Sequence, residues 1–220
     1  MVYYPGMRKF ISNRGGLTDN PYKSVRVNES HISEALEIAS KSSVYSVEDE
    51  IRNGFLTIDG GHRIGICGSA VIRDGRISFV KDISALNYRI AREVKGCAAP
   101  VINSVMRNGQ LRNTLIISPP GAGKTTILRD IARLLSDEGI RVCIVDERRE
   151  IAAMHNGRSS FDLGVSTTVF SGTPKAAGML MMLRAMSPDV IVTDEIGTGT
   201  DAAAVTKIIN SGTKIITTIH

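Results

Sequence analysis

One stretch decides the fold of this chain: it reads Ser118-Pro119-Pro120-Gly121-Ala122-Gly123-Lys124-Thr125. The stretch follows the apolar run Leu115–Ile117 and leads into a segment with helical periodicity, Thr125–Leu135. A strand that delivers a glycine-bearing loop to the start of a helix offers backbone N–H groups and the positive helix end to an anion. The stretch therefore predicts a phosphate-binding loop, although Ser118 stands where the usual pattern has glycine.

The predicted loop gives its residues parts in binding a nucleoside triphosphate. Lys124 is expected to reach the β- and γ-phosphates, and the hydroxyl of Thr125 is expected to take one position on Mg²⁺. ATP and Mg²⁺ are accordingly the predicted cofactors. The residues expected to contact the nucleotide in this region are Ser118, Pro119, Pro120, Gly121, Ala122, Gly123, Lys124, Thr125 and Thr126.

Acidic residues follow two further apolar runs. The pair Asp194 and Glu195 comes directly after one run, and the pair Asp146 and Glu147 comes after another. Because the C-terminal ends of parallel strands meet at the sheet edge where ligands bind, both pairs are expected beside the loop. Asp194 would hold Mg²⁺, and either Glu147 or Glu195 would activate the attacking water, with Glu147 preferred. A solvated charged turn is the alternative for residues 146–150.

A last apolar run, Ile215–Ile219, delivers His220 to the same expected edge. A neutral imidazole there could sense the γ-phosphate or position the water. The other interpretation is a terminal residue without a role. His220 therefore joins Lys124, Glu147 and Glu195 as a candidate catalytic residue.

Two kinds of periodicity divide the chain. Beyond residue 111, strand-length apolar runs alternate with helical segments, which indicates a parallel sheet covered on both faces. Expected strands there are 114–117, 142–145, 190–193 and 214–218, and expected helices are 125–135, 179–186 and 202–209. The first half has expected helices at 29–41 and 47–53 and expected strands at 55–58, 62–72 and 77–80.

These patterns predict three parts of the chain. Residues 1–24 are rich in Gly, Asn, Arg and Pro and are expected to be an irregular lead-in. Residues 25–100 are expected to form a small α+β domain with an antiparallel meander. Residues 101–220 are expected to form an α/β core around a parallel sheet.

Further marks give the chain a family resemblance. Gly60-Gly61-His62-Arg63 precedes the core, and Met186-Ser187-Pro188-Asp189-Val190-Ile191 precedes the second acidic pair. With the runs 115–151 and 173–197, these marks make residues 25–220 similar to the stage III sporulation AA family. That family belongs to the secretion and type IV pilus superfamily of hexameric RecA-like ATPases. The resemblance implies a RecA-like P-loop core that lacks its usual C-terminal portion here.

The resemblance also implies roles and partners. It places Glu147 in an acidic box that supplies the water-activating residue, and His220 near the γ-phosphate. Arg89 and Arg92 resemble basic residues that reach the nucleotide from the same or a neighbouring subunit, with ordinary salt bridges as the alternative. We expect, on this resemblance, a Mg²⁺-dependent ATPase that forms a homohexamer and energises a membrane-embedded channel of secretion components. Its expected place is the mother-cell side of the forespore membrane.

Composition narrows the remaining classes of function. No stretch approaches the ~20 consecutive apolar residues of a membrane span, and residues 1–9 lack the apolar core of a signal peptide, so a cytoplasmic protein is expected. The net charge is +5, but the Lys and Arg residues are spread singly along the chain and there is no Trp. This pattern disfavours nucleic acid as a partner. A RecA-like nucleic-acid motor and a nucleotide-gated assembly protein with little hydrolysis stay as alternatives.

Overall fold

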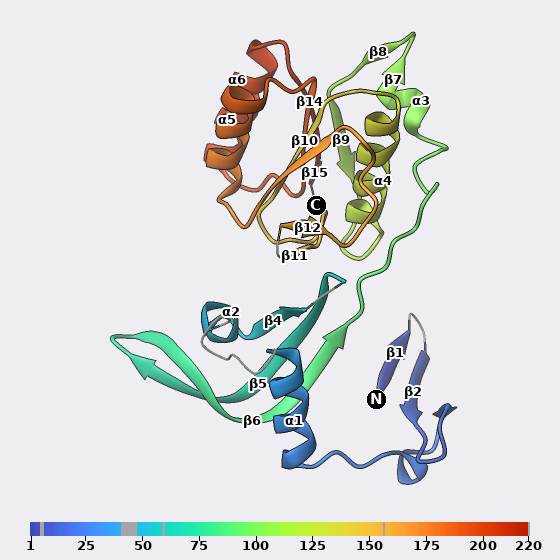
Figure 1. The fold of residues 1–220 in the computed structure, drawn as a ribbon, viewed down its shortest axis with the longest axis vertical. Helices are drawn as coiled ribbons and strands as arrows, with labels where there is room; N and C mark the ends of the chain where they lie inside the picture. The colour runs from blue at the N-terminus through green and yellow to red at the C-terminus, as the bar shows by residue number, and fades with distance from the viewer. Residues whose placement is uncertain (5–6, 41–47, 59, 156, 220) are drawn as a thin grey trace. The chain divides into compact units, whose positions relative to one another are not determined.

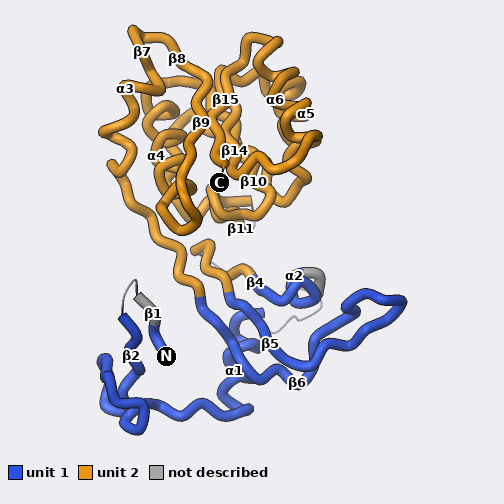
Figure 2. The backbone as a smooth tube through the Cα atoms, turned by 180° about the vertical axis from the view of Figure 1, so that it is seen from behind, with its two compact units in different colours: residues 1–56, 64–88 blue, residues 57–63, 89–220 orange. Residues whose placement is uncertain are grey.

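The computed structural model of the chain describes residues 1–4, 7–40, 48–58, 60–155 and 157–219. By its internal contacts the chain divides into two compact units, which Figure 2 colours separately. Unit 1 comprises Met1–Leu56 and Ile64–Tyr88, and unit 2 comprises Thr57–Arg63 and Arg89–His220. The short segment Thr57–Arg63 thus groups with the C-terminal part of the chain. The domain limits expected from the sequence stay a prediction.

Unit 2 is built on a five-stranded sheet in which every neighbouring pair of strands is parallel. The order across the sheet is β13-β10-β14-β15-β9 (Figure 1). The strands are β9 (Thr114–Ile117), β10 (Val142–Asp146), β13 (Thr167–Ser171), β14 (Val190–Thr193) and β15 (Lys214–Ile219). The helices are α4 (Lys124–Asp137), α5 (Lys175–Met186) and α6 (Gly199–Asn210). The predicted α/β core with a parallel sheet is confirmed.

Helices cover both faces of this sheet, because its strands carry apolar side chains on both sides. In β10, Val142 and Ile144 belong to one core cluster, whereas Cys143 and Val145 belong to the other. α4 packs on the first face, and α5 and α6 lie together on the second (Figure 1). Burial on both faces explains why β10 and β14 are near-continuous apolar runs in the sequence.

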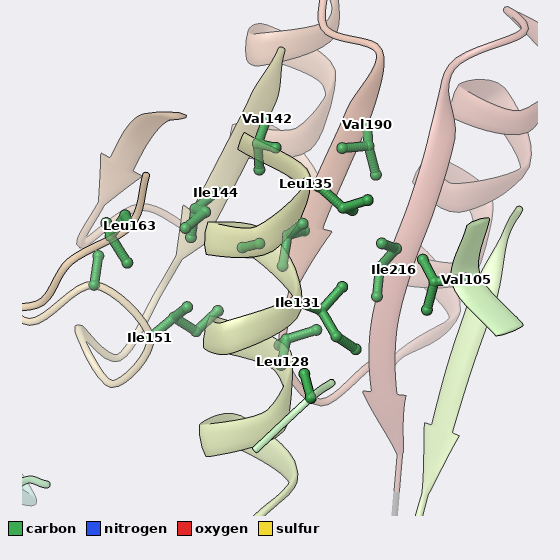
Figure 3. Packing of buried hydrophobic residues seen from close by; sticks show 14 residues of the cluster. Val105, Leu128, Ile131, Leu135, Val142, Ile144, Ile151, Leu163, Val190 and Ile216 are labelled. Carbon is green, nitrogen blue, oxygen red and sulfur yellow. The ribbon is translucent and has the colours of Figure 1, made fainter. Parts of the chain in front are cut away.

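The first cluster lies between α4 and the central strands. Leu128, Ile131 and Leu135 are fully buried and follow one another at helical spacing along α4. Figure 3 shows these side chains beside those of Val190 and Ile216. α4 is thereby fixed against the strands whose C-terminal ends carry the candidate site.

Short elements complete unit 2. The helix α3 (Ile102–Val105) leads into an antiparallel hairpin of β7 (Met106–Arg107) and β8 (Gln110–Leu111). A second antiparallel hairpin, β11 (Met154–His155) and β12 (Arg158–Ser159), lies between β10 and β13 in the sequence.

The N-terminal part of the chain contains two three-stranded sheets. The first is antiparallel and consists of β1 (Val2–Tyr4), β2 (Met7–Ile11) and β3 (Leu17–Thr18). The second has the order β4-β5-β6, with β4 (Phe55–Ile58), β5 (His62–Arg73) and β6 (Arg76–Arg89). Between the sheets in sequence come a 3-10 turn (Pro21–Lys23), α1 (Glu29–Ala39) and α2 (Glu48–Arg52). The predicted α+β region with a meander is confirmed.

Three details differ from the sequence-based expectations. Residues 1–24, expected to be irregular, contain β1 to β3, whose pairing uses main-chain hydrogen bonds and needs no apolar alternation. β6 continues beyond residue 80 as far as Arg89. β13 was absent from the expected strands, because this half-buried edge strand is rich in Ser and Thr. Residue 41 of the helix expected at 29–41 and residue 47 of the helix expected at 47–53 lie outside the described residues.

A glycine in α5 tests how tightly the second face is packed. An added Cβ at Gly178 would lie 2.6 Å from Cγ2 of Thr173 and 2.8 Å from Cγ1 of Val145. We expect Gly178→Ala to lower the free energy of unfolding by about 1–2 kcal/mol, because overpacking outweighs the ~1 kcal/mol that Ala gains over Gly in a helix. Urea unfolding measures the change.

The control is Gly199→Ala in α6, where no atom would lie within 4 Å of the new Cβ. It should change stability by no more than about 0.5 kcal/mol. Equal stability of the two variants would contradict the close packing of α5 on β10.

Candidate nucleotide-binding site

The glycine loop (residues 118–125) joins β9 to α4. Gly121 and Gly123 have φ values of +74° and +86°, a region that disfavours side chains, and nothing would lie within 4 Å of a Cβ on either residue. Gly123 precedes α4 and supplies no side-chain cap, and the first four N–H groups of an α-helix have no acceptor within the helix itself. The loop therefore offers an anion-binding geometry.

The ammonium group of Lys124 lies inside this loop. Lys124 is 8% exposed, and its Nζ donates to the carbonyl oxygen of Ser118 at 2.6 Å and to that of Pro119 at 3.0 Å. Both acceptors are neutral, so a phosphate oxygen would make a stronger hydrogen bond to the same ammonium. Thr125 comes next in the first turn of α4 and is half-buried.

The strand order brings the polar strand ends to one edge of the sheet. β15 lies between β9 and β14, and its register pairs Ile219 with Ile117 and Thr217 with Thr193. The glycine loop after β9, Asp194 after β14 and the end of β10 therefore leave the sheet at the same edge. His220, the other residue predicted at this edge, lies outside the described residues.

Three carboxyl-bearing residues at this edge share one ammonium group. We call Glu147, Asp194 and Glu195 the acidic cluster. Nζ of Lys175, the first residue of α5, donates to the carbonyl oxygen of Glu195 at 2.6 Å. The same atom lies 3.8 Å from Oε2 of Glu147 and 3.8 Å from Oδ1 of Asp194. A cation from one helix thus links residues at the ends of two strands.

Asp194 has a free acceptor atom in a buried position. The residue is 5% exposed, and its Oδ1 has no hydrogen-bond partner among the described residues. Burial raises the pKa of Asp194 to about 6, and the charge of Lys175 opposes this shift. A buried carboxylate oxygen without a donor fits Mg²⁺, which prefers oxygen ligands. The described residues contain no group of three or more His, Cys, Asp or Glu that could hold a metal, so Mg²⁺ would need phosphate oxygens and water as well.

The side chain of Asp146 binds main-chain N–H groups. Its fully buried carboxylate accepts hydrogen bonds from the N–H groups of Glu150 at 2.9 Å, Ile151 at 3.1 Å and Ala152 at 2.8 Å. Burial raises the pKa of Asp146, and the three N–H groups act in the opposite direction. These bonds close the acidic turn (residues 147–152). Of the predicted pair after β10, only Glu147 is then at the surface.

Glu195 is held in an unusual main-chain conformation. Its φ is +34°, which is rare for a residue with a side chain. Its N–H donates to Oγ1 of Thr218 at 2.8 Å, while its carbonyl accepts from Lys175. Nη1 of Arg148 lies 3.0 Å from Oε2 of Glu195. The carboxylate of Glu195 therefore already has a cationic partner in this structure.

The predicted arginines lie at the surface of the chain. Arg89 ends β6, and Arg92 follows three residues later, both exposed. The carbonyl of Arg92 accepts from Nη1 of Arg129 in α4 at 3.2 Å. Contact of Arg89 and Arg92 with a nucleotide stays a prediction.

Arg129 of α4 holds the acidic turn through its main-chain carbonyls. Its guanidinium donates to the carbonyl of Ile151 at 2.5 Å and to that of Glu150 at 2.7 Å. It also lies 3.9 Å from the ring centre of Phe161. The helix that begins at the glycine loop thus holds the turn that carries Glu147.

The Gly60–Arg63 segment contacts the acidic turn and residues that follow it in the sequence. The N–H of Gly60 donates to Oγ of Ser160 at 3.2 Å, and Arg63 lies 3.4 Å from Oε1 of Glu150. A Cβ on Gly61, whose φ is +69°, would overlap that of Ala153. This close approach of two main chains explains why the predicted family mark carries glycine at residue 61.

Sequence reasoning missed two residues of this site. Lys175 had one available signal, a lone lysine at the start of the apolar segment that becomes α5. Arg129 had none, because its partners are main-chain carbonyls that the fold alone brings together.

The fold of this chain places it in a structural class. The ATPase DotB of Legionella pneumophila matches 90% of this chain and 55% of its own at TM-score 0.56 and 17% identity. The pilus retraction motor PilT, solved with bound ADP, matches 88% of this chain and 55% of its own at TM-score 0.55 and 17% identity. The chain has the RecA-like fold of secretion and pilus ATPases.

The chain belongs to the family described as sporulation stage III, protein AA, whose model matches residues 11–220. Stage III sporulation protein AA of Bacillus subtilis (strain 168) is 41% identical over 186 residues. The match covers 82% of this chain and 60% of that relative. The family resemblance expected from the sequence is confirmed.

The different roles of Asp146 and Glu147 can be distinguished by measuring the free energy of unfolding of variants. We expect Asp146→Asn to lower the free energy of unfolding by about 2 kcal/mol or more, because the amide group would face buried N–H donors. Glu147→Gln should stay within about 0.5 kcal/mol of wild type, because the residue is exposed. Thermal and urea unfolding measure both changes, and the reverse ranking would contradict the assignment.

Proposed function

We propose that the protein binds and hydrolyses ATP as a motor of the secretion and pilus type. One observation carries the proposal: the glycine loop with Lys124 and the acidic cluster with the free oxygen of Asp194 leave one sheet edge together. Support comes from the fold shared with DotB and PilT and from membership of the sporulation family.

The glycine loop and the start of α4 bind the phosphate groups. Lys124 exchanges the carbonyls of Ser118 and Pro119 for phosphate oxygens, and its charge is retained near the loop. Thr125 and Asp194 hold Mg²⁺, which when bound neutralises charge that develops on the transferred phosphoryl group. Remaining contacts to the nucleotide come from the main chain of the loop and from Thr126.

Glu147 accepts the proton of the attacking water. It lies at the surface end of a turn that Asp146 fixes through three main-chain hydrogen bonds. The carboxylate of Glu195 is less suited to this task, because Nη1 of Arg148 already lies 3.0 Å from its Oε2, whereas Nζ of Lys175 lies 3.8 Å from Oε2 of Glu147. Glu195 instead helps to order the surroundings of Mg²⁺.

Further roles depend on assembly. Six copies form a ring in which Arg89 and Arg92 reach the nucleotide of the same or a neighbouring subunit, since a planar permanent cation suits a phosphoryl group that gains charge. His220 senses the γ-phosphate. These roles rest on the resemblance to hexameric relatives and on the exposure of the two arginines.

The proposed place of action is the cytoplasmic face of a membrane. In the part of the chain that the structure describes, no helix is long and apolar enough to cross a bilayer. We infer that the ring docks on a membrane-embedded channel and energises transport during sporulation, on the mother-cell side of the forespore membrane. The B. subtilis relative, named for stage III of sporulation, supports a role during sporulation.

Removal of the loop ammonium tests nucleotide binding. Lys124→Ala should weaken ATP binding at least about tenfold, because a charge-assisted hydrogen bond contributes about 1.5–3 kcal/mol. Calorimetry or fluorescent ATP measures the affinity. Lys207→Ala in α6, which removes an exposed lysine, is the matched control and should bind ATP as wild type does. Unchanged binding by Lys124→Ala would refute the site.

The choice between the two glutamates is tested by turnover. Glu147→Gln should reduce phosphate release by about 10²–10⁴-fold with ATP binding retained, the range typical for loss of a general base. Glu195→Gln should cause a smaller loss. Full turnover in Glu147→Gln together with loss in Glu195→Gln would assign the base to Glu195.

The two other classes of function predict different results in the same assays. An assembly protein would form larger particles with ATP, seen by light scattering, without phosphate release that depends on Lys124. A nucleic-acid motor would show ATP hydrolysis stimulated by DNA or RNA.

A further inference from the structure

Lys175 occupies the centre of the acidic cluster. It is 8% exposed, and it comes from α5, on the sheet face opposite to α4. A buried ammonium is tolerated where opposite charges and acceptors replace lost water. Among the described residues, its Nζ donates a short hydrogen bond to the carbonyl of Glu195, at 2.6 Å, and the carboxylates of Glu147 and Asp194 lie at 3.8 Å.

The two kinds of contact have different consequences. The bond to the carbonyl of Glu195 anchors the ammonium beside the cluster. The carboxylates are close enough for ion pairing and too far for a hydrogen bond, so Oδ1 of Asp194 keeps its lone pairs. Lys175 therefore compensates the charge of the carboxylates without satisfying Asp194 as an acceptor.

We propose that Lys175 is the built-in counter-ion of the acidic cluster and lowers its affinity for a free divalent cation. The cation would then bind well only when a triphosphate adds its own negative charges. This inference rests on the proposed function, because Asp194 of the acidic cluster is a proposed ligand of Mg²⁺. It makes Lys175 a positioning residue that couples entry of the metal to entry of the nucleotide.

The coupling follows from the charges that face the metal position. Without nucleotide, a divalent cation competes with an ammonium that is tied to the same residues and cannot diffuse away. The cluster holds few protein ligands, so the cation gains little there without phosphate oxygens. With nucleotide, the added negative charge favours the cation, and Lys175 stays anchored on the carbonyl of Glu195.

The test measures binding of Mn²⁺ alone, in the absence of nucleotide, from the electron paramagnetic resonance signal of the free ion. Wild type and Lys175→Arg should bind weakly. Lys175→Met and Lys175→Gln, which remove the charge, should bind Mn²⁺ at least tenfold more tightly. Lys207→Met in α6 removes a surface charge from the same unit and should match wild type.

A gain of affinity separates this role from a structural one, because damage to the fold weakens metal binding. Mn²⁺ affinities of Lys175→Met and Lys175→Gln equal to that of wild type would overturn the proposal. If neither variant folds, as judged by circular dichroism, wild-type protein is used. The proposal then fails if nucleotide strengthens Mn²⁺ binding to the protein less than tenfold, after the Mn²⁺ bound by the same concentration of nucleotide without protein is subtracted. This test does not measure phosphate release. Absence of hydrolysis would therefore contradict the proposed function, while the Mn²⁺ affinities would still decide the role of Lys175.

Discussion

The carboxylate of Asp146 is the contact on which the site depends. It is fully buried at the end of β10 and accepts hydrogen bonds from three successive N–H groups of the acidic turn. An ion in such a place is tolerated only where main-chain dipoles replace its lost water. The turn closed by these bonds presents Glu147 and directs two carbonyls to Arg129. A residue outside the chemistry therefore sets the place of the candidate base.

Two buried cations extend this arrangement across the sheet. Arg129 belongs to α4 on one face and holds carbonyls of the acidic turn, whereas Lys175 belongs to α5 on the other face and holds the carbonyl of Glu195. Each cation fixes main chain next to a carboxylate, so both helices take part in placing the acidic cluster. The left-handed conformation of Glu195, with φ of +34°, is kept by such bonds from two sides. The strand ends are thus held by side chains as well as by the sheet.

Local signals in the sequence were enough to predict the core. The strand 190–193 matches β14, and the helices and remaining strands around the glycine loop differ from expectation mainly at their ends. The strand β13 was not predicted, because an edge strand needs little apolar alternation in its sequence. The different roles of Asp146 and Glu147 and the position of Lys175 were not predicted either. Both depend on main-chain groups that meet only in the folded chain. The roles of His220, Arg89 and Arg92 stay predictions.

The approach of Gly61 to Ala153 has a mechanical consequence. Where long side chains meet, a small displacement is absorbed by a change of rotamer, but here two main chains touch with almost nothing deformable between them. β5 begins at His62, one residue further on, and runs for 12 residues. A shift of Ala153, the residue after the acidic turn, would therefore displace Gly61 and the start of β5 at His62.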